Sequence, residues 1–271
     1  VAVYFGQPSA ATGTTVVLCS PAAIITGRQN AGRFGQTLAS LGDLDGDGCS
    51  DFVVSGVNEE YTGLLEGGLH LIRGWGKQGC PDAPRVSVFA PGIDGVRSGS
   101  RLTGGLDLDG DEVPDLVMAN PGFTANLLQQ GMIWLVSGAY LASAPTYSQT
   151  DWTLEDVKPM WPFNVPAEVY RYAGPTKQAR FGTSLALYRP FGEVGPAQVI
   201  VGAPNGAESG IFAGGGAYAL EFSTTDGFAG QPTMIFGGES ARALSKLGTS
   251  VATGFVGEKS MAVVGGPGSS A

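Results

Sequence analysis

The sequence predicts an all-β protein built from repeated units of four short antiparallel strands. The chain has 44 glycines in 271 residues, and only 14% of its residues are charged. This composition favours short strands and tight turns over helices. Short apolar segments bounded by glycines also recur in one order along the chain, which is typical of repeat architectures. We therefore expect one continuous domain, residues 1–271.

The first strand of each unit is rich in small residues. Its four copies are 34–38, 98–102, 181–185 and 247–251. Each copy contains a glycine followed by polar or small residues, as expected for strands that crowd around a common axis where large side chains do not fit.

The next three strands of the unit differ in their apolar pattern. The second strands are 52–56, 116–122, 199–204 and 262–267, and they are almost wholly apolar, as expected when neighbouring units cover both faces. The third strands are 1–5, 68–72, 131–135 and 216–220. They alternate more, so we expect partial exposure near the rim. The fourth strands are 23–26, 86–89, 168–172 and 233–236. Four strands in about 65 residues make a blade of a β-propeller.

An acidic loop follows the first strand in two of the units. It places aspartates at loop positions 1, 3, 5 and 9, and the second copy begins 64 residues after the first. The aspartates are Asp43, Asp45, Asp47 and Asp51 in one copy, and Asp107, Asp109, Asp111 and Asp115 in the other. Carboxylates at this density repel one another, and a hard cation that takes six to eight oxygens relieves the repulsion, which favours Ca²⁺ over Mg²⁺. The sequence therefore predicts two Ca²⁺ sites.

An EF-hand is the rival interpretation of these loops. It requires a following helix and an acidic residue at loop position 12. Position 12 is Val54 in the first copy and Met118 in the second, and both belong to apolar strands. The corresponding loops of the later units, 188–198 and 253–260, lack the aspartates and are predicted to be metal-free.

The order Phe-Gly, Asp-x-Asp-x-Asp-Gly-x-x-Asp, Val-Gly-Ala-Pro resembles the FG-GAP repeat of integrin alpha-subunit β-propellers. Phe181-Gly182 and Gly202-Ala203-Pro204 match the name of the repeat literally. The resemblance implies Ca²⁺ in the acidic loops, with the backbone carbonyls of Cys49 and Val113 as further ligands. Glu112 departs from the pattern, because glycine is expected at loop position 6.

The resemblance also suggests how the chain divides. Propellers of this family usually have seven blades, so we expect about four blades of a larger propeller. The expected units are 1–30 (partial), 31–94, 95–178, 179–243 and 244–271 (partial).

Three cysteines allow one disulfide bond. Cys49 lies between strands one and two of its blade, and Cys80 lies between strands three and four. Both connections fall on the same face of a propeller, which favours Cys49–Cys80. Cys19–Cys49 and three reduced thiols are the alternatives.

An insertion of about 20 residues between Ala139 and Pro166 lengthens the third unit. It is rich in proline and aromatic residues, among them Trp152 and Trp161, which are candidate contacts for a protein partner or a glycan. The alternative is a hairpin that folds back over the rim.

The sequence predicts no enzyme. The single histidine, His70, lies within a strand and is expected to be packed, and neither a nucleophile elbow nor a P-loop is present. The net charge of −9 without a basic stripe argues against nucleic acid. No apolar run reaches the roughly 18 residues of a membrane span.

Together these features predict a Ca²⁺-stabilised extracellular or cell-surface β-propeller that serves in protein–protein interaction, adhesion or structural assembly. A carbohydrate-binding propeller, or a non-catalytic part of a polysaccharide-acting enzyme, is the alternative.

Overall fold

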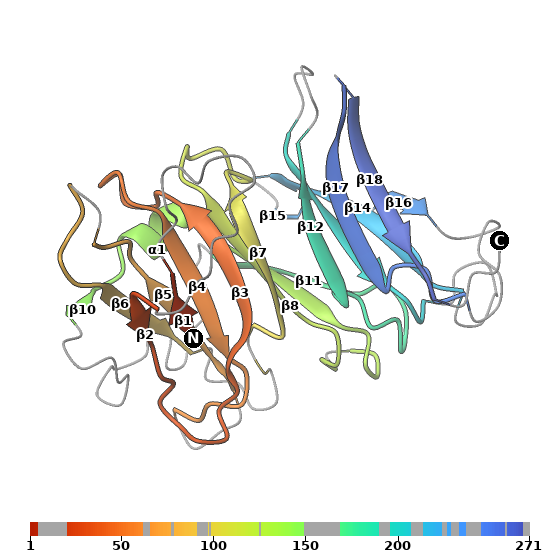
Figure 1. Ribbon diagram of the computed structural model, residues 1–271. Coiled ribbons are helices and arrows are strands. Elements are labelled where there is room, and N and C mark those ends of the chain that lie inside the picture. The colour runs from red at the N-terminus through yellow and green to blue at the C-terminus, as the bar shows by residue number, and fades with distance from the viewer. Residues whose placement is uncertain are drawn as a thin grey trace, which may run out of the picture.

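The computed structural model shows a chain made almost entirely of antiparallel sheets (Figure 1). It describes residues 1–4, 21–61, 66–76, 79–90, 97, 99–124, 126–148, 169–189, 196–206, 214–223, 227–228, 233–236, 245–257 and 259–267. No helix in this part of the chain is long and apolar enough to cross a membrane.

Three sheets contain the four strands predicted for a complete blade. Blade A consists of β3 (Phe34–Gly42), β4 (Asp51–Gly56), β5 (Gly68–Ile72) and β6 (Arg85–Phe89). Blade B consists of β7 (Arg101–Leu106), β8 (Asp115–Asn120), β9 (Met132–Val136) and β11 (Val169–Ala173). Blade C consists of β12 (Ser184–Tyr188), β13 (Gln198–Ala203), β14 (Gly216–Ser223) and β16 (Thr233–Phe236), and β14 also pairs with β15 (Gly227–Phe228).

Two-stranded sheets flank these blades. One pairs β1 (Ala2–Val3) with β2 (Ala23–Ile24), and the other pairs β17 (Ser250–Val256) with β18 (Lys259–Gly265). The strand order within each sheet agrees with the predicted order, so the blade architecture is confirmed.

The first strands of successive blades lie side by side. β3 contacts β7, β7 contacts β12, and β12 contacts β17, as the ribbon also shows (Figure 1). Small residues also permit a first strand to approach the second strand of the preceding blade: a Cβ added at Gly182, just before β12, would lie 2.6 Å from the Cβ of Ala119 in β8. Gly182 also has a φ of 88°, a backbone conformation that residues other than glycine rarely adopt.

The core fills the spaces between blades. One cluster joins blades A and B, with Leu41 and Leu116 among its buried members, and a second joins blades B and C around Phe181. The second strands are buried as predicted. The third strands β5 and β9 are also buried, so the partial exposure expected of them was wrong, whereas β1 is partly exposed as expected. The fourth strands β6 and β11 cover the outer edges of β5 and β9, and the hydrophobic clusters between blades cover their faces.

The insertion after β9 begins by folding back onto the preceding blade. Helix α1 (Gly138–Ala142) is followed by β10 (Tyr147–Ser148), which pairs with β6 of blade A. The hydroxyl of Ser87 donates to the carbonyl of Pro145 at 2.8 Å. This described part of the insertion covers the rim, whereas Trp152 and Trp161 lie outside the described residues.

His70 is fully buried in blade A and is part of a polar cluster. Its Nε2 lies 2.5 Å from Oε2 of Glu59, and the Tyr61 hydroxyl donates to the same oxygen at 2.6 Å. Burial alone would raise the pKa of Glu59, but the hydrogen bonds and charge from His70, with the bond from Tyr61, hold this pKa below its ordinary value. His70 is therefore packed, as its position within a strand predicted.

Candidate metal centres

Two acidic loops connect the first and second strands of blades A and B. Loop 1 (residues 43–51) joins β3 to β4, and loop 2 (residues 107–115) joins β7 to β8. In each loop, the aspartates at positions 1, 3 and 9 place carboxylate oxygens within 4.8 Å of one another. Asp43, Asp45 and Asp51 form one group, and Asp107, Asp109 and Asp115 form the other.

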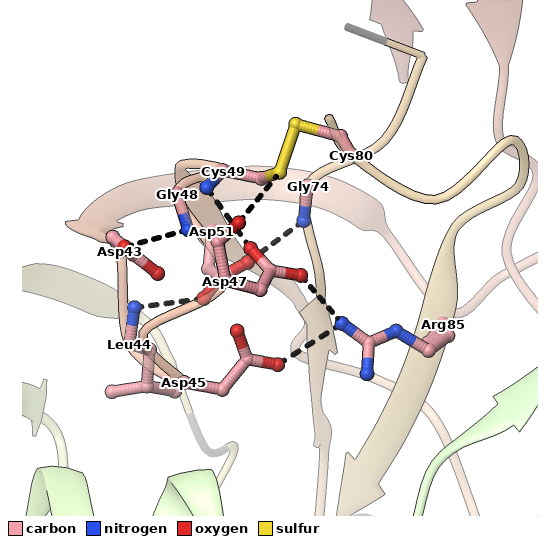
Figure 2. Close-up of a disulfide and its surroundings, with 10 residues drawn as sticks. All are labelled: Asp43, Leu44, Asp45, Asp47, Gly48, Cys49, Asp51, Gly74, Cys80 and Arg85. Atoms are coloured by element: carbon pink, nitrogen blue, oxygen red, sulfur yellow. Dashed lines mark hydrogen bonds and ion pairs between the residues drawn. A yellow bond between two sulfur atoms is a disulfide. The ribbon is translucent and has the colours of Figure 1, made fainter. Parts of the chain in front are cut away.

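The aspartate at position 9 anchors each loop to the blade. The Asp51 carboxylate accepts the backbone N–H of Leu44 at 2.9 Å and that of Gly74 at 2.7 Å (Figure 2). In loop 2, Asp115 accepts the N–H of Leu108 at 2.7 Å and that of Gly138 at 2.6 Å. Both carboxylates are buried, at 1% and 0% exposure.

Burial and crowding perturb these carboxylates. Burial raises the pKa of Asp51, and it raises the pKa of Asp115 to about 7, with the charges of Asp109 and Asp111 adding to the effect. Burial, followed by the charge of Asp111, also raises the pKa of Asp109. Burial is thus the main reason why the charged form of these aspartates is disfavoured in the metal-free loops.

The aspartates at position 5 have other hydrogen-bond partners. The Asp47 carboxylate accepts the Cys49 N–H at 2.9 Å and Nη2 of Arg85 at 2.8 Å. Asp111 accepts the Val113 N–H at 2.8 Å and the Ser137 hydroxyl at 3.1 Å. Neither Asp47 nor Asp111 belongs to the three-carboxylate group of its loop.

Position 6 adopts the same backbone in both loops. Gly48 has a φ of 83° and Glu112 a φ of 69°. A non-glycine residue there costs roughly 1–2 kcal/mol. The N–H groups of both residues still donate to the position-1 aspartate, at 2.9 Å to Asp43 and 3.0 Å to Asp107. The substitution therefore preserves the geometry of loop 2.

The Cys49–Cys80 disulfide is present, as predicted, with its Cα atoms 5.9 Å apart (Figure 2). It excludes the Cys19–Cys49 alternative, and Cys19 lies outside the described residues. The bond ties loop 1 to the connection between β5 and β6.

Two arginines beside loop 1 escaped the sequence analysis. Arg85 donates to Asp45 at 3.1 Å and to Asp47 at 2.8 Å, and Nε of Arg73 lies 3.5 Å from Asp45. Arg73 directly follows β5, and Ser137 directly follows β9 in blade B. Arg73 and Ser137 therefore occupy corresponding positions in two repeats. A comparison of the repeats at this position would have drawn attention to Arg73 from the sequence alone.

The loops fit a hard divalent cation. Oδ1 of Asp45 is buried and accepts no hydrogen bond from the described residues. A buried carboxylate oxygen without a donor is costly. Ca²⁺ binds oxygens of this kind. The residues brought together in each loop can therefore supply carboxylate ligands to one ion.

Blades of four antiparallel strands, with acidic loops between their first and second strands, define a β-propeller segment. The family model described as FG-GAP repeat matches residues 98–136, which include loop 2 and strands β7 to β9. The chain therefore contains an FG-GAP repeat.

Relatives of known name cover a wider part of the chain. Integrin alpha-IIb of Homo sapiens is 34% identical over 105 residues, which is 39% of this chain and 10% of the relative. Integrin alpha-5 of Xenopus laevis is 32% identical over 130 residues, 46% of this chain and 12% of the relative. Integrin alpha pat-2 of Caenorhabditis briggsae is 31% identical over 146 residues, which is 49% of this chain and 12% of the relative. The chain is thus integrin alpha-like over up to half of its length, and each match spans about a tenth of the relative.

Proposed function

We propose that the chain is part of a Ca²⁺-stabilised β-propeller that acts outside the cell or at its surface, in protein–protein interaction, adhesion or structural assembly. The observation that carries this proposal is the repeated acidic loop, which has the same geometry in two adjacent blades. Similarity to integrin alpha subunits supports the choice of function.

Each loop would hold one Ca²⁺. The proposed ligands are Asp43, Asp45, Asp47, the carbonyl of Cys49 and Asp51 in loop 1, and Asp107, Asp109, Asp111, the carbonyl of Val113 and Asp115 in loop 2. Ca²⁺ takes six to eight oxygens, so the position-5 aspartates would turn inward to join the other carboxylates. The ion would be structural, because it fixes a loop that its own carboxylates push apart.

The setting and the absence of catalysis are part of the same proposal. A disulfide persists in oxidising compartments such as the cell exterior. Glu59 and His70 are fully buried and hydrogen-bonded to each other, which supports a non-catalytic role for this cluster. We also propose that residues 1–271 form one propeller segment, with units near 31–94, 95–178 and 179–243 between partial units near 1–30 and 244–271.

The direct test is a calorimetric titration of the chain with Ca²⁺. Two bound ions per chain are expected, and the loss of one after Asp107→Ala would assign loop 2. A titration without binding would overturn the metal assignment. A glycan array would test the carbohydrate-binding alternative, which requires sugar binding that is lost on Trp152→Ala or Trp161→Ala.

A further inference from the structure

Helix α1 lies between the two acidic loops and contacts the surroundings of both. At its start, the N–H of Gly138 donates to Asp115 at 2.6 Å, and the preceding hydroxyl of Ser137 donates to Asp111 at 3.1 Å. At its end, the carbonyls of Leu141 and Ala142 accept Nη2 of Arg73 at 3.0 and 3.2 Å. One short helix thus orients two aspartates of loop 2 and binds an arginine of blade A.

Arg73 connects the end of α1 to loop 1. Its side chain is 1% exposed, and its Nε lies 3.5 Å from Oδ2 of Asp45. Burial lowers the pKa of Arg73, while the charges of Asp45 and Asp51 act in the opposite direction. A buried cation needs partners. Arg73 therefore depends on both the loop 1 carboxylates and the α1 carbonyls.

We propose that Arg73 is a positioning residue that couples the two loops, so that Ca²⁺ binding in one loop raises the affinity of the other. This inference rests on the proposed Ca²⁺ sites. An ion in loop 1 binds the Asp45 carboxylate and so weakens the interaction of this carboxylate with Arg73. Arg73 then binds the carbonyls of α1 more tightly. The ordered helix presents Ser137 and Gly138 to loop 2. The first ion thereby orders a segment that the second ion needs, which gives positive cooperativity.

Direct repulsion between the two ions opposes this coupling only weakly. The loops face a solvent-open cavity of about 600 Å³, with Asp43 and Asp45 on one side, Glu112 on the other, and Ala142 along its wall. Exposed charges are screened over about 8 Å at physiological salt. The hydrogen bonds through α1 are buried or partly buried and are screened less.

The test compares Ca²⁺ affinities by calorimetry in the whole chain. Inactivating loop 2 with Asp107→Ala and Asp109→Ala is expected to lower the Ca²⁺ affinity of loop 1 about fivefold. Inactivating loop 1 with Asp43→Ala and Asp47→Ala, which leaves the contact between Asp45 and Arg73 in place, should lower the affinity of loop 2. In an Arg73→Met background, inactivating loop 2 should leave the affinity of loop 1 unchanged.

Arg85→Met is the matched control. Arg85 also contacts Asp45 but, among the residues that the structure describes, makes no hydrogen bond to α1, so this variant loses the same charge and should keep the fivefold dependence on loop 2. Arg73→Lys should restore part of the coupling. Two loops that bind Ca²⁺ with affinities independent of each other would overturn this inference and leave the metal sites intact. A chain that binds no Ca²⁺ would overturn the proposed function instead. If Arg73→Met does not fold, the two loop variants still decide whether the Ca²⁺ affinities of the loops depend on each other, and Arg73→Lys tests the role of Arg73.

Discussion

Loop 1 and loop 2 share one backbone but stand in different electrostatic surroundings. Loop 1 has Arg85 and Arg73 within 4 Å of its carboxylates and a disulfide at Cys49. Loop 2 has a serine hydroxyl in place of Arg73 and an additional acid, Glu112, and no ion pair with a basic side chain is found there among the described residues. Fixed cations and a covalent bond can therefore stabilise loop 1 in part, whereas loop 2 depends more on a bound ion.

Removing the disulfide should have the largest effect on this comparison. The pair Cys49→Ser and Cys80→Ser opens a loop of 31 residues, which is expected to lower the free energy of unfolding by about 3–4 kcal/mol. Loop 1 should then resemble loop 2, so that EDTA lowers the melting temperature more than in the parent chain. Urea unfolding with and without Ca²⁺ measures both effects. An equal EDTA effect in both proteins would show that the disulfide does not support the loop.

Removing the position-1 aspartate should lower the unfolding free energy by different amounts in the two loops. Asp107→Ala is expected to cost about 3 kcal/mol of unfolding free energy at saturating Ca²⁺, which corresponds to an ion present at about 100 times its Kd. Asp43→Ala should cost less, because Arg85 and the disulfide remain at loop 1. The two substitutions are matched, since each also removes the acceptor of one position-6 N–H group. Equal costs in denaturant unfolding would contradict the proposed difference between the loops.

The pH dependence should be clearest at loop 2. Burial raises the pKa of Asp115 in the metal-free fold from its ordinary value of 3.8 to about 7. Protonated Asp115 therefore stabilises the metal-free fold below pH 3.8, and this contribution is lost as the pH rises through 7. Ca²⁺ requires the carboxylate form, so its affinity for loop 2 should fall about tenfold from pH 8 to pH 6. Titrations of the Asp43→Ala variant isolate loop 2, and a flat profile would argue against Asp115 as a ligand.

The smallest effect is expected from Arg85. This side chain is about one-third exposed, and such ion pairs contribute at most about 1 kcal/mol. Arg85→Met should raise the Ca²⁺ affinity of loop 1 about threefold, because a competing cation is removed, and should leave loop 2 unchanged. Calorimetry in the Asp107→Ala background measures loop 1 alone. A lower affinity would mean that Arg85 orients Asp45 and Asp47 rather than competing for them.

The sequence predicted the features that depend on local spacing. Aspartates at alternate positions and the glycines before each strand define the loops and the blade order without knowledge of distant residues. The disulfide followed from placing Cys49 and Cys80 on the same face of one blade.

The features that were missed depend on contacts between distant segments. Arg85 reaches loop 1 because β6 pairs with β5, and Arg73 reaches α1 because the insertion folds back onto blade A. The exposure expected of β5 and β9 was wrong for the same reason, since alternation along a strand does not reveal what the next blade covers.

Thermal melting of the intact chain, in Ca²⁺ and in excess EDTA, tests the central claim most directly. If ions in the two loops stabilise the blades, EDTA should lower the melting temperature by about 5–10 °C, and added Ca²⁺ should restore it. A melting temperature that is the same in Ca²⁺ and in EDTA would contradict a structural role for the ions.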